Sequence, residues 1–311
     1  MKNILYCFDN NYNYQALNSI TSLLKHTNEK LNIFIIHEHP KKFLKILKKY
    51  LNTQANINIF KFNDNHYDFP RVNNTHVSIA TYYRLFISNY IEDSLDTILY
   101  LDADTICSGD LTKDIKNLSE KILKEDILFA ASSEVDPEIS CKRLGMKQNK
   151  YFNAGVMLIN FKKWKKENTG EKLLNIMKSK YDNILWWDQD ILNVHADGDY
   201  LELNQELNFR SNYHNFKNEE KLKVYHFLGD LKPWNPETVG SEYSEIYQNE
   251  YRNATSKKYH IEFKANSLKN SYYRIFKSGK IKEINYSINF IYVFLGKLIK
   301  YLFKKLYLKL Q

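Results

Sequence analysis

The sequence predicts an α/β fold in which a mixed, mostly parallel sheet is flanked by helices. Apolar runs of β-forming residues alternate with helical patterns through the first half of the chain, as in successive strand–helix–strand units. The chain has 311 residues, 43% hydrophobic and 26% charged, enough for one large domain with a packed core and an extension. Such sheets bind ligands outside the carboxyl ends of their strands, so the residues that follow each strand are the candidate site residues.

The elements follow in order along the chain. The first unit comprises a strand at 4–8, a helix at 14–25 and a strand at 33–36. A helix at 40–51 carries Phe43, Leu44, Leu47 and Leu51 on one side and lysines on the other. The remaining predicted strands are 57–62, 97–101, 127–132, 156–159 and 224–227, and the remaining helices are 79–91, 161–181 and 188–195.

Positive charge is concentrated at the C-terminus. Residues 256–311 hold 13 Lys and Arg but only two acidic residues, a net charge of +11, so the preceding 255 residues carry −2 of the total +9. A near-neutral body argues against a nucleic-acid groove. We therefore divide the chain into a catalytic domain, 1–255, and a basic amphipathic extension, 256–311.

The extension has the pattern of a helix that lies on a membrane surface. Residues 284–296 are uncharged and too few to span a bilayer, and leucines and lysines then recur at helical spacing. The expected partner is an anionic membrane surface. An amphipathic helix packed on the body or on a partner subunit gives the same pattern.

Cysteine content and the N-terminus indicate the compartment. Cys7, Cys107 and Cys141 are too few for a disulfide framework, which favours a reducing environment. The first residues lead directly into a predicted strand and contain no apolar stretch long enough for a secretory signal. We expect a cytoplasmic protein that is peripheral on the inner face of the cytoplasmic membrane.

The strongest chemical signal is Asp102-Ala103-Asp104 at the end of the predicted strand 97–101. Two carboxylates one residue apart repel each other unless a cation joins them. Oxygen ligands of this kind suit Mn²⁺ or Mg²⁺, ions that also hold substrate phosphates. The pattern therefore points to a metal–diphosphate site, although Asp is also common in turns and helix caps.

A second cluster follows the predicted strand 224–227. His226 offers a nitrogen ligand for Mn²⁺, Gly229 allows close approach of the backbone to a phosphate, and Lys232 supplies a positive charge. A lone histidine is more often structural, but the three residue types lie within seven positions.

Three further groups have the chemistry of a nucleotide-sugar site. Asp9, Asn11 and Tyr12 follow the first strand and suit a base and ribose, although an Asn-rich turn is equally compatible. Asn153 and the small residues after it precede a strand, where a plain turn is the alternative. The third group is the segment Trp186-Trp187-Asp188-Gln189-Asp190. Its carboxylates and amide can hydrogen-bond sugar hydroxyls, and its aromatic faces can cover a sugar ring. A helix N-cap is the alternative interpretation.

Taken together, these stretches resemble family 8 glycosyltransferases, most closely the bacterial lipopolysaccharide galactosyl- and glucosyltransferases. The resemblance spans about residues 1–240 and rests on segments 4–12, 76–85, 98–104, 151–164, 187–193 and 226–234. It implies a GT-A (Rossmann-like) fold, Mn²⁺ with Mg²⁺ as the alternative, and a UDP-glucose or UDP-galactose donor transferred with retention to a saccharide or glycolipid acceptor.

The resemblance also implies roles for individual residues. Asp102, Asp104 and His226 match the metal ligands, and Ala103 lies between the two acids in the donor site. The uridine pocket is matched by Cys7, Asp9, Asn11, Tyr12 and Val77. Contacts to the donor sugar are matched by Arg84, Asn153, Ala154, Asp188 and Gln189, and contacts to the diphosphate by Gly229 and Lys232. The catalytic group comprises Gln189, Asp188 and Asp190, with the Gln189 amide oxygen steadying the cationic sugar.

One departure concerns Ser132-Ser133-Glu134, where close relatives often have Asp near the acceptor or the sugar. The identity of the hexose and of the acceptor is therefore left open. A sugar nucleotidyltransferase and a non-catalytic, membrane-associated nucleotide-sugar binder are the alternative functions. The first strand is not followed by the glycine-rich loop of a nucleotidyltransferase or a dinucleotide oxidoreductase.

Overall fold

The computed structural model describes residues 3–51, 55–63, 67–70, 78–92, 94–212 and 220–262, with five more near the C-terminus: 295, 296, 298, 299 and 302. The expectations for Val77 and for nearly all of the basic extension fall outside these residues. The chain divides into two compact units. The first comprises residues 1–209 and 221–226, and the second comprises residues 210–220 and 227–311. The second unit thus begins before the predicted domain boundary at residue 255, and that boundary stays a prediction.

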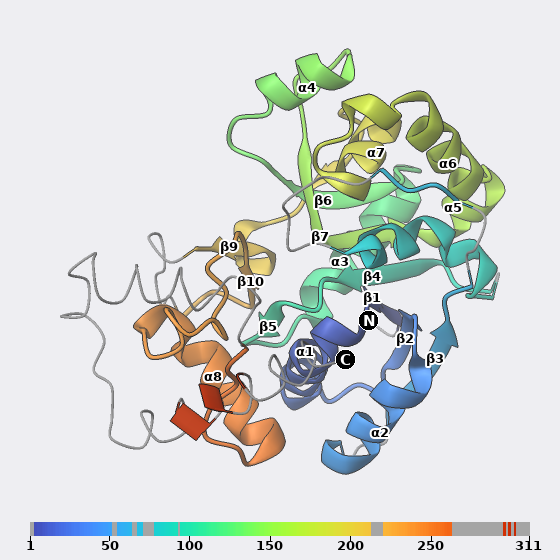
Figure 1. Cartoon of the computed structure of the whole chain (residues 1–311). Helices are drawn as coiled ribbons and strands as arrows, with labels where there is room; N and C mark the ends of the chain where they lie inside the picture. Colours follow the sequence, from blue (N-terminus) through green and yellow to red (C-terminus); the bar gives the residue numbers. More distant parts are fainter. Residues whose placement is uncertain are drawn as a thin grey trace. The chain divides into compact units, whose positions relative to one another are not determined.

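The first unit contains a seven-stranded sheet with the order β3-β2-β1-β4-β7-β6-β8 (Figure 1). Its strand β7 runs antiparallel to both of its neighbours, whereas the other adjacent pairs are parallel, so the sheet is mixed and mostly parallel as predicted. The strands are β1 (Asn3–Phe8), β2 (Asn32–His37), β3 (Asn56–Lys61), β4 (Thr97–Leu101), β6 (Phe129–Ser133), β7 (Phe152–Asn160) and β8 (Leu201–Glu202).

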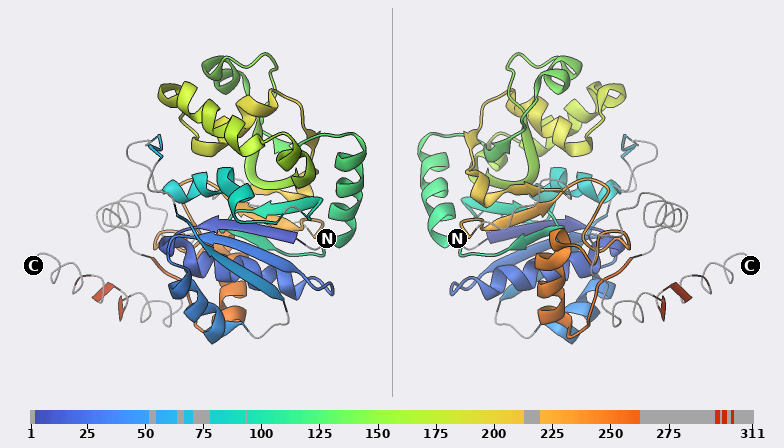
Figure 2. Two further views of the ribbon diagram at one scale, coloured as in Figure 1. Left: turned by 90° about the vertical axis from the view of Figure 1, so that its right-hand side faces the viewer. Right: turned by 90° about the vertical axis from the view of Figure 1, so that its left-hand side faces the viewer.

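Helices cover both faces of this sheet (Figure 2). Alternate side chains of β1 point to opposite faces, so that Tyr6 packs in one core and Leu5 in the other. The Tyr6 face is covered by α1 (Asn13–Lys25), α2 (Pro40–Tyr50) and α3 (Thr112–Lys124). The Leu5 face is covered by the 3₁₀ helix η2 (Ile79–Asn89) and by α5 (Phe161–Lys166), α6 (Thr169–Ser179) and α7 (Trp187–Ala196).

The other elements are shorter or belong to the second unit. They are η1 (Asn10–Tyr12), β5 (Thr105–Cys107), α4 (Glu138–Leu144), η3 (Tyr181–Asn183), η4 (Gln205–Leu207), β9 (Phe209–Ser211), β10 (Val224–Phe227) and α8 (Glu242–Thr255). In the second unit, the Gln248 side chain on α8 donates to the carbonyls of Pro233 and His260 and accepts from the His260 N–H. These bonds hold the segment after α8 against the helix.

Two expected helices differ from the structure. The predicted helix 161–181 is wrong as one piece, because Asn168 adopts a left-handed backbone, φ 52°, and separates α5 from α6. The Asn160 side chain accepts a hydrogen bond from Lys163 N and caps α5. In α2 only Phe43 and Leu47 are buried, whereas Leu44 is 41% exposed among the lysines.

The strand that passes the site is longer than predicted and carries a bulge. Whereas the sequence predicts the strand at 156–159, β7 begins at Phe152. Its register with β6 jumps from Met157 opposite Ala131 to Asn153 opposite Ser132, so residues 154–156 have no counterpart on β6. The bulge leaves the backbone of these residues available to the site.

Within the described part of the chain, no helix combines the length and the apolar composition needed to cross a bilayer.

His37, at the end of β2, is buried in its neutral form. Its Nδ1 accepts a hydrogen bond from the His39 N–H at 2.8 Å, so that nitrogen carries a lone pair, and Nε2 donates to Asn13 Oδ1 at 3.0 Å. The ring packs against Phe8 and Phe43. Burial lowers the pKa of His37 to about 4.

This buried histidine makes stability depend on pH. In the unfolded chain the His37 imidazole takes up a proton near pH 6.5, so between pH 6.5 and 4 the unfolded state binds more protons and the free energy of unfolding rises with pH. The slope from this group is at most about 1.4 kcal/mol per pH unit. Urea denaturation of the native protein and of His37→Asn should show a stability difference that grows in favour of the native protein from pH 4.5 to pH 7. A difference that stays constant over this range would contradict the assignment.

Candidate metal and donor site

The Asp102-Ala103-Asp104 motif forms the tight turn that joins β4 to β5. The Asp102 carbonyl accepts hydrogen bonds from Thr105 N at 3.2 Å and from Thr105 Oγ1 at 2.8 Å. The Asp102 N–H donates to the Gly155 carbonyl in the β7 bulge at 2.8 Å. Ala103 packs into the core beneath the turn. These residues therefore form a turn, in agreement with the alternative interpretation. The turn also brings the carboxylates of Asp102 and Asp104 close together.

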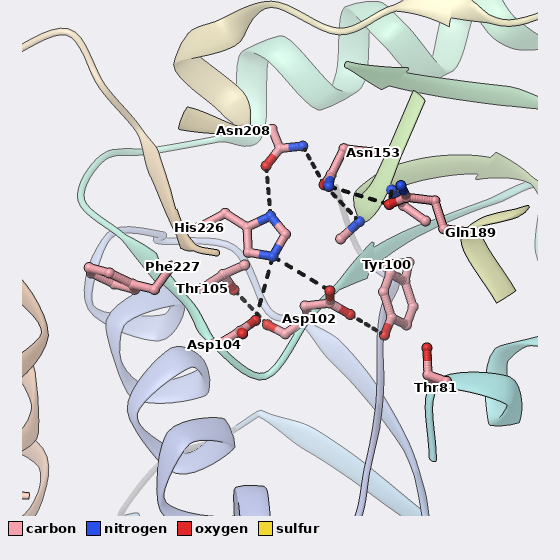
Figure 3. Close-up of polar contacts among 12 residues, drawn as sticks. Thr81, Tyr100, Asp102, Asp104, Thr105, Asn153, Gln189, Asn208, His226 and Phe227 are labelled. Carbon is pink, nitrogen blue, oxygen red and sulfur yellow. Dashed lines mark hydrogen bonds and ion pairs between the residues drawn. The ribbon is translucent and has the colours of Figure 1, made fainter. Parts of the chain in front are cut away.

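The strand β10 brings His226 to these carboxylates. β5 and β10 pair antiparallel, with His226 opposite Thr105, the residue after Asp104. The ligand atoms of Asp102, Asp104 and His226 all lie within 4.8 Å of one another. His226 Nε2 is 3.6 Å from Asp102 Oδ2 and 3.6 Å from Asp104 Oδ1 (Figure 3). The structure thus brings together the three predicted metal ligands. In the sequence His226 lies 124 residues after Asp102 and 122 residues after Asp104.

The donor set fits a divalent cation. Two carboxylate oxygens and one imidazole nitrogen form a mixed O/N set of the kind that Mn²⁺ accepts. The second oxygen of Asp102 is already engaged by the Tyr100 hydroxyl at 2.6 Å and by Arg84 at 3.0 Å, which directs Oδ2 toward His226. Space is kept by Gly155, because a Cβ at that position would lie 2.0 Å from His226 Cε1 and 2.8 Å from Asp102 Oδ2.

Arg84, on η2, is the cation that organises the acidic side chains. Its side chain is 5% exposed, and its guanidinium lies 3.9 Å from the centre of the Tyr100 ring. It donates to Asp102 Oδ1 and, at 2.6 Å, to the Ala154 carbonyl. Its Nε lies 2.8 Å from Asp188 Oδ2, an ion pair without an aligned hydrogen bond, because that N–H points to the Thr81 carbonyl.

Asp188 lies at the start of α7 and is 2% exposed. Burial raises its pKa to about 6, while Arg84 and a hydrogen bond from the Thr81 hydroxyl oppose that shift. The carboxyl group therefore ionises only near neutral pH. The residue before it, Trp187, has a positive φ of 47°, a strained conformation for a tryptophan that turns the chain into the helix.

Gln189 is held against the β7 bulge. Its amide oxygen accepts hydrogen bonds from Ala154 N at 3.0 Å and from Asn153 Nδ2 at 3.4 Å. Asn193, one turn further along α7, exchanges hydrogen bonds with both backbone groups of Phe152 and also bonds the Gln189 carbonyl. The predicted donor-sugar residues Arg84, Asn153, Ala154, Asp188 and Gln189 thus form one connected group with the metal ligands.

Asp190 differs from its neighbours because both of its oxygens are saturated. They accept two hydrogen bonds from the Arg143 guanidinium, one from the Tyr151 hydroxyl and one each from the N–H groups of Leu185 and Trp186. The side chain is fully buried. It fixes the loop that precedes α7.

The residues predicted for the uridine pocket lie at and after the end of β1. Cys7 is buried, and burial raises the pKa of its thiol. Asp9 caps η1 by accepting from Asn11 N at 2.8 Å and from the Asn11 side chain at 3.1 Å. Tyr12 is half-buried and Asn11 is exposed. The Asn-rich turn therefore exists, and its use as a nucleoside pocket stays a prediction.

Gly229 and Lys232 belong to the second unit. Gly229 has a φ of 72°, a conformation that favours glycine, and a Cβ there would meet no atom of the described residues within 4 Å. Lys232 is 3% exposed, and its Nζ donates to the Phe227 carbonyl at 2.5 Å. Their predicted contacts with a diphosphate stay a prediction.

Several residues of the site escaped the sequence interpretation. Thr81 and Tyr100 lie within stretches that were singled out, but nothing in the sequence tied them to Asp188 and Asp102. Asn208 precedes β9 and hydrogen-bonds His226, at a position with no sequence signal. Glu134, noted as a departure, accepts a hydrogen bond from Asn153 at 3.2 Å and so lies beside the predicted sugar site.

The fold and this cluster of side chains define a glycosyltransferase with the GT-A fold. The family model for glycosyl transferase family 8 matches residues 3–238. The chain belongs to this family.

Curated relatives agree with this assignment, and a solved structure agrees with the fold. The chain is 32% identical to lipopolysaccharide 1,2-glucosyltransferase of Escherichia coli (strain K12), over 75% of this chain and 72% of that protein. It is 30% identical to lipopolysaccharide 1,3-galactosyltransferase of Salmonella typhimurium over the same shares. The crystal structure of the galactosyltransferase LgtC, in complex with donor and acceptor sugar analogs, covers 81% of this chain and 96% of its own, with a TM-score of 0.68 and 24% identity.

Replacing Gly155 tests the geometry of the metal site. In Gly155→Ala the new methyl group would overlap His226, so we expect Mn²⁺ affinity, measured by electron paramagnetic resonance, to fall at least tenfold. Gly109→Ala is the matched control, because the nearest atom to its Cβ would be Cγ of the flexible Lys223 side chain, at 3.2 Å. Native Mn²⁺ affinity in Gly155→Ala would show that the cation binds elsewhere.

Proposed function

We propose that the protein is a retaining hexosyltransferase that moves glucose or galactose from a UDP-sugar to a saccharide or glycolipid acceptor. The acceptor class is lipopolysaccharide or another cell-surface saccharide. The convergence of Asp102, Asp104 and His226 at one point carries the proposal. The similarity to lipopolysaccharide glucosyl- and galactosyltransferases supports the choice of hexose and acceptor.

Asp102, Asp104 and His226 would hold Mn²⁺, which accepts an imidazole nitrogen more readily than Mg²⁺ does. When bound, the ion supplies Lewis-acid stabilisation of the diphosphate leaving group. The protein supplies the rest of the electrostatic environment. Arg84 orients Asp102 by donating to its Oδ1, and Tyr100 donates to the same carboxylate oxygen.

The region around Gln189 and Asp188 would hold the hexose. Hydrogen-bonding groups for the sugar would come from Asp188 Oδ2, which lies near Arg84, and from the Asn153 amide next to the β7 bulge. Gln189 would lie beside the anomeric carbon, and its amide oxygen, which Ala154 N and Asn153 Nδ2 hold in place, would face the growing positive charge. An amide is a poor nucleophile, so this oxygen steadies the charge and does not form a bond.

The anomeric configuration is then retained because the acceptor hydroxyl attacks the anomeric carbon on the face from which the leaving group departs. A two-step route needs a carboxylate free to bond the anomeric carbon. Asp190, the nearest carboxylate in the sequence, has its oxygens occupied by five donors and holds a loop. We therefore assign Asp190 a positioning role, and an oxygen of the donor phosphate takes the acceptor proton in the same-face route.

The basic extension would place the enzyme on the inner face of the cytoplasmic membrane, beside a glycolipid acceptor. Each lysine near an anionic surface contributes about 1 kcal/mol to binding. We expect the full-length protein to sediment with phosphatidylglycerol vesicles, and to lose most of that binding when four tail lysines become Gln: Lys297, Lys300, Lys304 and Lys305. The matched control makes the same change at four exposed lysines of α3: Lys113, Lys116, Lys121 and Lys124. Equal losses in the two variants would reject the tail as the anchor.

Donor turnover tests the catalytic proposal. With Mn²⁺, release of UDP from a panel of UDP-sugars should be fastest for UDP-glucose or UDP-galactose. Asp102→Asn and Asp104→Asn should each lower the rate at least a hundredfold, because each removes a charged ligand. Asp199→Asn, an acidic residue in the turn after α7, is the control and should keep the native rate.

The outcomes separate the alternatives. A non-catalytic binder would be stabilised by UDP and Mn²⁺ but would release no UDP from any sugar nucleotide. A sugar nucleotidyltransferase would release pyrophosphate from a nucleoside triphosphate and a sugar phosphate. Full activity in either Asp102→Asn or Asp104→Asn would remove the metal from the mechanism.

A further inference from the structure

The polarity of the hydrogen bonds around His226 is fixed by one backbone group. The Gly155 N–H donates to Asn153 Oδ1 at 3.1 Å. A backbone N–H can only donate, so the Asn153 atom that faces it is the amide oxygen. The Asn153 nitrogen then points the other way, toward Glu134 Oε1 at 3.2 Å and Gln189 Oε1 at 3.4 Å.

Asn208 passes this polarity on to the imidazole. The Asn208 side chain lies between Asn153 and His226 and is 2% exposed (Figure 3). Its contact with Asn153 Oδ1, at 3.3 Å, requires a donor, so the Asn208 nitrogen lies there. The Asn208 oxygen therefore faces His226 Nδ1, at 3.1 Å. An amide oxygen only accepts, so Nδ1 is the nitrogen that carries the proton.

We infer that Asn208 is a positioning residue that holds His226 in the Nδ1–H tautomer, so that the Nε2 lone pair faces Asp102 and Asp104. This inference rests on the proposed metal-dependent function. Without Asn208, the two carboxylates 3.6 Å from Nε2 would favour a proton on that nitrogen and block it as a ligand. The same Asn153 amide also contacts Gln189, so one hydrogen-bond chain sets the orientation of groups at the metal end and at the sugar end of the site.

Only an amide satisfies both neighbours of this buried position. Aspartate would still accept from His226 Nδ1, but it would place an oxygen against the Asn153 oxygen. Leucine has nearly the same volume and fulfils neither contact. The two substitutions therefore separate control of the tautomer from mere filling of space.

The tautomer is measured directly in the metal-free native protein at pH 8. Long-range ¹H–¹⁵N correlation spectra of ¹⁵N-histidine-labelled protein, with His226 assigned from its absence in His226→Asn, should show protonated Nδ1 and unprotonated Nε2. In Asn208→Leu the proton should move to Nε2, and Mn²⁺ affinity should fall 10- to 100-fold. Asn208→Asp should keep the native tautomer and lie within a few-fold of native affinity.

Asn204→Leu, an exposed position without a capping hydrogen bond at the other end of η4, is the matched control and should keep both native properties. An Nε2–H tautomer in the native protein would overturn the inference without any variant. Native tautomer and native Mn²⁺ affinity in Asn208→Leu would also overturn it. Either result would leave the proposed function intact. The proposed function itself would fail if the native protein bound no Mn²⁺, or if His226→Ala bound Mn²⁺ as tightly as the native protein.

Discussion

The site depends on the charge balance of one small cluster of acidic side chains around Arg84 and His226. Asp102 and Asp188 share Arg84, and Asp104 faces Asp102 across His226. When ionised, three carboxylates and one guanidinium leave a net charge of −2, and Arg84, Asp104 and Asp188 are buried. Such a cluster is costly unless a cation offsets it. A divalent ion would supply the missing charge, and burial raises the pKa of Asp188 in the same cluster.

The backbone is arranged to deliver these side chains. The turn after β4 presents Asp102 and Asp104, and the antiparallel register of β5 and β10 places His226 opposite Thr105. The bulge in β7 brings the Gly155 carbonyl to Asp102 and the Ala154 carbonyl to Arg84, and the absence of a Cβ at Gly155 leaves room for the imidazole. Arg84 then orients Asp102, and Asn208 orients His226. The predicted metal ligands, the bulge and the predicted donor-sugar residues are parts of one hydrogen-bonded assembly.

Hydrophobic periodicity was enough to predict β1 to β4 and the alternation with α1 and α2, because these depend on local sequence. Strand-end chemistry pointed to Asp102, Asp104 and His226, which the structure brings together, and their use as metal ligands stays a prediction. The break between α5 and α6 was not predictable, since it depends on the left-handed backbone of Asn168. Likewise α8 was not predicted, although its buried Tyr243, Tyr247 and Tyr251 recur at helical spacing. Its buried Gln248 depends on hydrogen bonds to residues outside the helix. The roles of Thr81, Tyr100 and Asn208 arise only from tertiary contacts between segments far apart in the chain.

Anomalous diffraction at the manganese edge, from crystals grown with Mn²⁺ and UDP, tests the central claim most directly. The account predicts one strong anomalous peak within coordination distance of Asp102 Oδ2, Asp104 Oδ1 and His226 Nε2, in contact with the diphosphate of UDP. Ordered UDP with no peak among these three atoms, or with manganese bound at another place, would contradict it.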